Sequence, residues 1–144
     1  NIMSIDKELT RLGLTLPAPA KPAGSYKPCI IADNTAYISG QGPLLDDGTF
    51  AKGVVGKDLD LETAQIHAQR CGLAILSALK AEIGDLNRVQ QLIKITGFVN
   101  CTNDFIKQPL VINGCSDLMK EVFGDKGIHA RAAVGVNSRI FSRD

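Results

Sequence analysis

The sequence predicts an α+β fold, in which a mixed β-sheet carries two helices on one of its faces. Two long segments repeat apolar residues at the spacing of an α-helix, and three other regions have the alternating pattern of strands. No internal repeat and no linker divides the 144 residues. We therefore expect a single domain over residues 1–144.

The first 25 residues are expected to form an arm that precedes the folded body. Four of the six prolines lie between Pro17 and Pro28, which favours an extended chain there. The first 14 residues mix acids and bases and contain no apolar core of the kind that a signal peptide has. We therefore expect no export, and a cytoplasmic location.

A β-hairpin is expected next. The segments YKPCIIA and TAYISG flank Asp33 and Asn34, a residue pair that suits a tight turn between two strands. The glycine-rich segment 42–59 that follows has the composition of a long loop, with residues 49–55 as a candidate short strand.

Two helices and two further strands complete the predicted fold. Asp60 is suited to cap a helix that Gly84 ends, and Pro109 is suited to open a second helix that Gly124 ends. The buried stripes are expected to be Ala64, Ala68, Cys71, Ile75 and Ala78 in the first helix, and Val111, Cys115, Leu118 and Val122 in the second. Between the helices, a strand is expected to present Val89, Ile93, Ile95 and Val99 on one face, and HARAAVGV at 129–136 supplies the last predicted strand.

Composition excludes several classes of function. The net charge is +1, from 16 basic and 15 acidic residues without a basic run, which argues against a nucleic-acid partner. No stretch approaches the roughly 20 apolar residues that cross a bilayer, so no membrane partner is expected. The four cysteines form no C-x-x-C pair, and only two histidines accompany them. We expect buried thiols in a reducing compartment, with no metal site and no cofactor.

Arg131 is the candidate for ligand binding that the strand pattern itself indicates. Because side chains alternate along a strand, Arg131, Ala133 and Gly135 share one face. The two small residues are expected to leave room beside the guanidinium, whose planar donors suit a carboxylate. A structural ion pair at the start of a strand is the other interpretation of this arginine.

Five segments in register carry a resemblance to a known family. They are PAGSYKP, YISGQGP, GDL followed by VQQLIKITGFVN, then VINGCSDLMKEVFG and HARAAVGV. In order and spacing they resemble the RidA family, also called YjgF or the endoribonuclease L-PSP family, over residues 9–136. The SGQGP, INGASDL-like and HAR segments are similar to a longer-chain branch of that family.

The resemblance implies a chorismate-mutase-like α+β fold and a homotrimer with clefts between neighbouring subunits. It implies hydrolysis of reactive enamines and imines to 2-oxo acids and ammonia, so the expected ligand is a small carboxylate-bearing imine, enamine or 2-oxo acid. Two alternatives stay open: a trimer that binds small carboxylates without turnover, and an endoribonuclease of the L-PSP type. The second would require an acid–base pair and phosphate-binding charge, which the sequence does not clearly show.

The same resemblance indicates the site residues. Arg131 corresponds to the family arginine that pairs with the substrate carboxylate, and it is the predicted catalytic residue. Tyr26 corresponds to a tyrosine near the cleft, and Asn113 to an asparagine at the cleft or at the subunit contact. Gly40 and Ala133 complete the predicted substrate-binding set. For Tyr26, Asn113 and Gly40, ordinary roles in packing, helix cover and a strand bend are the competing interpretations. His129 either reaches the site or simply precedes the strand.

Two features depart from the family pattern. Ala132 and Ala133 stand where the founding branch often has a serine and a cysteine. Residues 137–144 form an atypical, shortened tail in place of the family's Leu-Pro turn and final strand, so the glutamate of that strand corresponds to no residue here. If the final strand is truly absent, carboxylate binding is better supported than imine hydrolysis.

Overall fold

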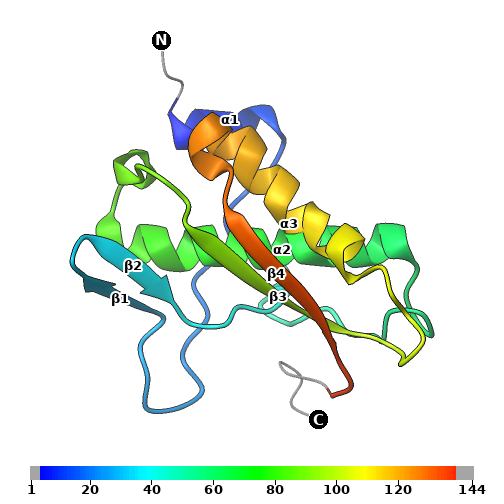
Figure 1. The fold of residues 1–144 in the computed structure, drawn as a ribbon. Coiled ribbons are helices and arrows are strands. Elements are labelled where there is room, and N and C mark those ends of the chain that lie inside the picture. The colour runs from blue at the N-terminus through cyan, green and yellow to red at the C-terminus, as the bar shows by residue number, and fades with distance from the viewer. Residues whose placement is uncertain (1–3, 139–144) are drawn as a thin grey trace.

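The computed structural model describes residues 4–138, and it has the predicted α+β fold (Figure 1). The residues of the predicted tail beyond Ser138, including Ile140, Phe141 and Asp144, lie outside this range. The elements are α1 (Ile5–Arg11), β1 (Cys29–Ala32), β2 (Thr35–Ile38), α2 (Leu61–Ile83), η1 (Leu86–Arg88), β3 (Lys94–Asn100), α3 (Gln108–Phe123), η2 (Gly124–Gly127) and β4 (Ala130–Val136), where η marks a 3-10 helix.

The predicted hairpin is confirmed. Strands β1 and β2 pair antiparallel, and Asp33 and Asn34 form the turn with φ angles of 49° and 59°. Two consecutive residues with positive φ give the tight turn whose twist matches that of paired strands, and Asp and Asn tolerate this conformation well.

Both long helices begin and end as predicted. The side chain of Asp60 accepts a hydrogen bond from the Thr63 amide at 2.8 Å, and α2 ends at Gly84 with a φ of 81°. Pro109 lies in the first turn of α3, which ends at Gly124 with a φ of 64°. All four residues of the predicted α3 stripe are buried, whereas in α2 the stripe is wider than predicted and Cys71 and Ile75 are only partly buried.

Three details of the predicted pattern are wrong. The N-terminal arm contains the helix α1 at residues 5–11, which was not predicted; Ser4 caps this helix, and Ile5 and Leu9 pack into the core. The candidate strand at 49–55 makes only isolated bridges, such as Leu44 to Phe50. Strand β3 begins at Lys94, and Ile93 is 62% exposed instead of buried.

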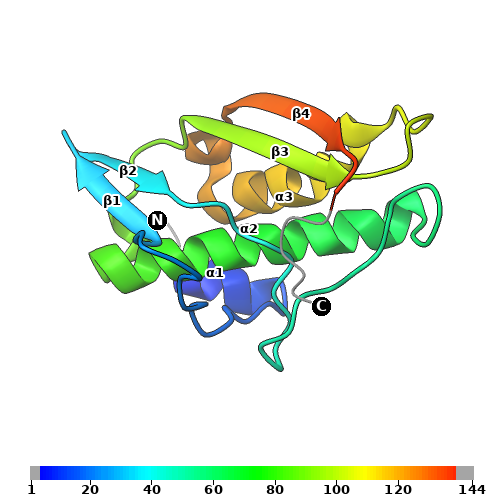
Figure 2. The same ribbon diagram turned by 90° about the horizontal axis from the view of Figure 1, so that it is seen from below.

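Within residues 4–138 the sheet consists of two separate pairs of strands, an antiparallel pair β1–β2 and a parallel pair β3–β4. Figures 1 and 2 show β2 and β3 running in the same general direction, with α2 and α3 on one side of both pairs. The backbones of α2 and α3 come very close to each other at Gly114. A Cβ atom on this residue would lie only 2.0 Å from the carbonyl oxygen of Gln65. Leu73 and Leu76 of α2 and Met119 of α3 are completely buried.

No helix in the described part of the chain has the length and apolar character needed to span a membrane.

Candidate functional site

Arg131 lies in β4 on the face that is turned towards α3, and residues of α3 bind its side chain. The guanidinium Nη1 donates one hydrogen bond to Asn113 Oδ1 at 2.7 Å and a longer one to Ser116 Oγ at 3.2 Å. Asn113 and Ser116 are three residues apart in α3, a spacing that places both on one face of a helix. The structure therefore brings together two of the predicted site residues, Arg131 and Asn113.

The two bonds leave one edge of the guanidinium open. An Nη1 group carries two hydrogens, and both are directed to α3. The Nε and Nη2 groups have no hydrogen-bond partner within residues 4–138, and the side chain is exposed. These two groups form the side of the guanidinium that grips a carboxylate with two parallel hydrogen bonds. Arg131 is thus fixed by the protein at one end and available to an anion at the other.

His129 and Ser116 extend this arrangement. The His129 ring lies 2.9 Å from Ser116 Oγ through Nε2 and 2.7 Å from the Gly127 carbonyl through Nδ1. Ser116 therefore contacts both Arg131 and His129. Ser116 was not predicted from the sequence, although its spacing from Asn113 in the helix was a signal, and the role of His129 was left open.

The expected open floor beside Arg131 is only partly present. Ala133 is half-buried and packs against the core, and a Cβ on Gly135 would lie 2.9 Å from both Cys101 Sγ and Gln108 Nε2. Side chains already fill the space beneath Gly135, which corrects the expectation that it leaves room for a ligand. The open space is at the outer edge of the guanidinium, on its Nε and Nη2 side.

Tyr26 and Gly40 lie in other parts of the chain. Tyr26 is 52% exposed in the segment before β1, and its hydroxyl accepts a hydrogen bond from the Ala23 amide at 3.2 Å. Gly40 follows β2 and borders a groove described below. Within residues 4–138 no hydrogen bond or ion pair joins either residue to Arg131. Within residues 4–138, therefore, Asn113 meets the guanidinium of Arg131, whereas Tyr26 and Gly40 do not.

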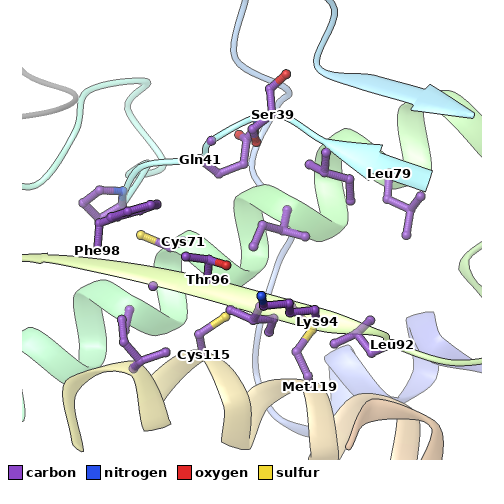
Figure 3. Close-up of a pocket in the computed structure, with 18 of the residues that line it drawn as sticks. Ser39, Gln41, Cys71, Leu79, Leu92, Lys94, Thr96, Phe98, Cys115 and Met119 are labelled. Atoms are coloured by element: carbon purple, nitrogen blue, oxygen red, sulfur yellow. The ribbon is translucent and has the colours of Figure 1, made fainter. Parts of the chain in front are cut away.

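A groove of about 1500 Å³ lies between β2 and β3 (Figure 3). Its upper wall comes from Ser39 and Gln41 after β2, and Figure 3 shows Thr96 and Phe98 of β3 opposite them. Cys71 of α2 and Cys115 and Met119 of α3 also line it. Arg131 is not among its lining residues. We place the candidate site at Arg131, because a hydrogen-bonded guanidinium with an open edge specifies a ligand and a largely apolar groove does not.

The cysteines close to the site are protonated thiols. Burial raises the pKa of Cys115 to about 11, although the nearby Arg131 acts in the opposite direction. Cys71 is only partly buried because it borders the groove, yet the surrounding apolar groups raise the pKa of its thiol to about 12. Neither cysteine is a thiolate near pH 7, so neither is an activated nucleophile. No group of three metal-binding side chains occurs within residues 4–138.

Comparison with known proteins gives the family. Residues 6–140 match the family described as "YjgF/chorismate_mutase-like, putative endoribonuclease". The chain belongs to this family. The match covers every element described above except the first residue of α1, and it includes Arg131 and the α3 residues that hold it. The resemblance that the sequence motifs indicated is thereby confirmed at the level of family and fold.

Three known proteins illustrate what the chain is similar to. Protein TCP17 from Trypanosoma cruzi is 42% identical over 129 residues, which cover 89% of this chain and 81% of that protein. The crystal structure of Atu1372 from Agrobacterium tumefaciens, of unknown function, is 43% identical with a TM-score of 0.87, covering 96% of this chain and 84% of the other. A "putative endoribonuclease" from Shewanella oneidensis MR-1 is 29% identical with a TM-score of 0.92, covering 96% and 91%.

Proposed function

We propose that this protein hydrolyses small carboxylate-bearing enamines and imines to 2-oxo acids and ammonia at Arg131. The observation that carries the proposal is the guanidinium whose Nη1 is bound by Asn113 and Ser116 while its Nε and Nη2 remain available. An arginine oriented in this way can hold a planar carboxylate in one position. The reacting carbon, next to that carboxylate, would then have a defined place.

The proposed chemistry requires modest acceleration. Enamines and imines react with water unaided, so a protein that holds the substrate and a water molecule in the correct geometry lowers the barrier through positioning. Arg131 would bind the carboxylate, a proton would be added to the enamine carbon, and water would attack the resulting iminium carbon. The carbinolamine then expels ammonia and leaves the 2-oxo acid. No metal or cofactor is needed for these steps.

The proposed assembly is a homotrimer with its sites between subunits. The exposed faces of the strand pairs carry apolar residues, and each face is formed by cross-strand partners: Ile30 with Tyr37, and Phe98 with Val134. Tyr37 is 63% and Phe98 57% exposed in the single chain. Large apolar side chains on a sheet surface support burial against a second copy. A neighbouring subunit would also bring further residues, with Tyr26 and Gly40 as candidates, to Arg131.

The test is release of 2-oxo acid and ammonia from a freshly generated imino acid. We expect the protein to raise the rate above that of spontaneous hydrolysis, and Arg131→Ala to lose the increase. An Arg131→Ala protein with the full rate would contradict the assignment of the site.

Binding without turnover is the second candidate function, favoured because the Arg131–Asn113 pair by itself accounts only for carboxylate recognition. Calorimetry with 2-oxo acids, which would show binding in the absence of catalysis, distinguishes it. Ribonuclease activity, which the name of the Shewanella oneidensis relative suggests, ranks third. RNA cleavage that survives Arg131→Ala would place that activity elsewhere.

A further inference from the structure

Ser116 and His129 form a hydrogen-bonded chain that ends at the proposed substrate anchor. The chain runs from the Gly127 carbonyl to His129 Nδ1 at 2.7 Å, from His129 Nε2 to Ser116 Oγ at 2.9 Å, and from Ser116 Oγ to Arg131 Nη1 at 3.2 Å. Both His129 and Ser116 are partly buried. A histidine held at both ring nitrogens and linked to a hydroxyl is an arrangement that can move a proton.

The partners of His129 determine which nitrogen carries the proton. A carbonyl oxygen only accepts, so Nδ1 bears a hydrogen and donates it to Gly127. In the neutral ring, Nε2 is then an acceptor, and the Ser116 hydroxyl donates to it. The Ser116 oxygen in turn accepts the hydrogen bond from Arg131 Nη1. In this state every hydrogen of the chain is directed along it.

Protonation of His129 changes the direction of one hydroxyl. The imidazolium donates from both nitrogens, so Nε2 becomes a donor to Ser116 Oγ. The serine oxygen then accepts from His129 and from Arg131, which occupies both of its lone pairs. Its own hydrogen is released to point out of the chain. When His129 is neutral, the Ser116 hydroxyl proton is therefore hydrogen-bonded to Nε2. When His129 is protonated, that proton is free to be donated to a substrate.

We propose that Ser116, supplied by His129, exchanges the protons of the hydrolysis at Arg131. This proposal rests on the proposed function. Because Ser116 contacts Nη1 and the carboxylate would lie at the Nε and Nη2 edge, the Ser116 hydroxyl donates its proton to the enamine carbon through one water molecule. The serine oxygen then takes the Nε2 proton of the imidazolium. The iminium accepts the oxygen of water at its carbon, and the proton that this water loses returns through Ser116 to His129. In the carbinolamine, the hydroxyl proton passes to the amine, the C–N bond breaks, and ammonia leaves as the carbonyl forms. Substrate and water thus become 2-oxo acid and ammonia, and the protonation of Ser116 and His129 is restored.

Ser116 and His129 have different roles in this hydrogen-bonded chain. Ser116 is adjacent to the group that anchors the substrate and is the residue that would exchange protons with it. His129 acts through Ser116, as a positioning residue that sets the direction of the hydroxyl and holds the proton between steps. Asn113, the other partner of Arg131 Nη1, only accepts a hydrogen bond through its Oδ1 and belongs to anchoring.

The experiment measures binding and turnover separately in Ser116→Ala, His129→Ala and the wild type. Turnover is followed as 2-oxo acid released from a freshly generated imino acid, and binding is followed by calorimetry with pyruvate. General acid–base groups contribute large factors in ordinary reactions, but for this reactive substrate we expect kcat to fall by about tenfold in each variant. The dissociation constant for pyruvate should stay within about twofold, since the proposal assigns binding to Arg131.

Two further measurements separate a proton relay from a merely structural contact. Imidazole added to His129→Ala should restore kcat, whereas it should leave Ser116→Ala unchanged. His129→Gln keeps a hydrogen-bonding side chain but cannot carry the proton, so it should show the same loss of kcat as His129→Ala. If His129→Ala fails to fold, His129→Gln takes its place in the experiment. The matched control is His67→Ala, which removes the other histidine, in α2, and should keep the wild-type kcat.

The possible outcomes distinguish the two proposals. A wild type with turnover and a His129→Ala variant of equal kcat would overturn the relay and leave the proposed function standing. Equal loss of pyruvate binding and turnover in His129→Ala, without imidazole rescue, would assign the histidine a structural role and also overturn the relay. A wild type that binds pyruvate but releases no 2-oxo acid would overturn the proposed hydrolysis and the relay together.

Discussion

Asn113 and Arg131 lie 18 positions apart in the sequence, and their side chains meet with 2.7 Å between Oδ1 and Nη1. The contact joins α3 to β4, so a helix determines how the strand presents its arginine. Because the amide oxygen takes one end of the guanidinium, the other end keeps its parallel donors for a ligand. The orientation of Arg131 therefore depends on a neighbour that carries no charge and does not compete for the ligand as a carboxylate would.

Replacement of Arg131 by lysine should show that shape, and not charge alone, binds the carboxylate. Lysine keeps the positive charge but loses the planar fork of donors. Charged hydrogen bonds contribute about 1.5–3 kcal/mol each, and because this site is exposed we expect the lower value, or about tenfold weaker binding of pyruvate. Calorimetry measures the change. Arg11→Lys, at an arginine that pairs only with Glu8, is the matched control and should bind as the wild type does.

Asn113→Asp should weaken anion binding without a loss of side-chain volume. The new carboxylate would lie where the amide oxygen accepts from Nη1, and it would partly neutralise Arg131. Exposed ion pairs contribute up to about 1 kcal/mol, so we expect pyruvate to bind up to roughly fivefold more weakly. The effect should diminish with added salt. Tighter binding in Asn113→Asp would show that the ligand does not meet Arg131.

The parts of the fold that the sequence could predict are those that local patterns determine. Asp60, Gly84 and Gly124 set the limits of α2 and α3 through caps and positive φ angles, which depend on a few neighbouring residues. The start of β3 could not be predicted, because Ile93 continues the alternation although the ladder begins only at Lys94. The helix α1 was not predicted, because the prolines that follow it indicated an arm outside the folded body.

The candidate site was predictable only in part, for a related reason. Arg131 was suggested by strand alternation and by the family motif, and Asn113 by the motif alone. The link of Ser116 to both Arg131 and His129 depends on how α3 lies across β4, which no local pattern specifies. The filled space below Gly135 likewise comes from Cys101 and Gln108, which belong to other elements.

Gly114→Ala should destabilise the fold strongly, because two helix backbones meet there. The added Cβ would lie 2.0 Å from the carbonyl oxygen of Gln65, which cannot move without shifting α2. We expect a loss of about 3 kcal/mol in the free energy of unfolding, the upper end of overpacking costs. Urea denaturation measures it.

Gly72→Ala is the matched control for Gly114→Ala on the facing helix. Its Cβ would meet only side-chain atoms, with Leu118 Cδ2 at 2.9 Å and Cys115 Sγ at 3.2 Å. Alanine also gains about 1 kcal/mol of helix propensity over glycine, which offsets a small shift of those side chains. We expect a change within about 1 kcal/mol. Equal losses in the two variants would mean that the helices can separate at Gly114.

Phe98→Glu should dissociate the proposed trimer. Phe98 and its cross-strand partner Val134 are exposed on the sheet face opposite the helices, and a buried carboxylate there would be costly. Light scattering after size exclusion should show trimer for the wild type and monomer for the variant. Ile106→Glu, at a residue 81% exposed in the segment between β3 and α3, should remain trimeric. A monomeric wild type would contradict the assembly directly.

Replacement of Asp60 separates its cap from its charge through the pH dependence of stability. Hydrogen bonds from Thr63 lower the pKa of Asp60 in the folded protein. A carboxyl whose pKa is lowered on folding stabilises the protein above its unfolded pKa of about 3.9, and this contribution is lost as pH falls through the lower folded value.

Asn caps a helix about as well as Asp but does not titrate. In urea denaturation, Asp60→Ala should therefore have a lower midpoint than the wild type at pH 7, and Asp60→Asn should differ less. The difference between the wild type and Asp60→Asn should shrink below pH 4. A difference that grows on acidification would contradict a lowered pKa for Asp60.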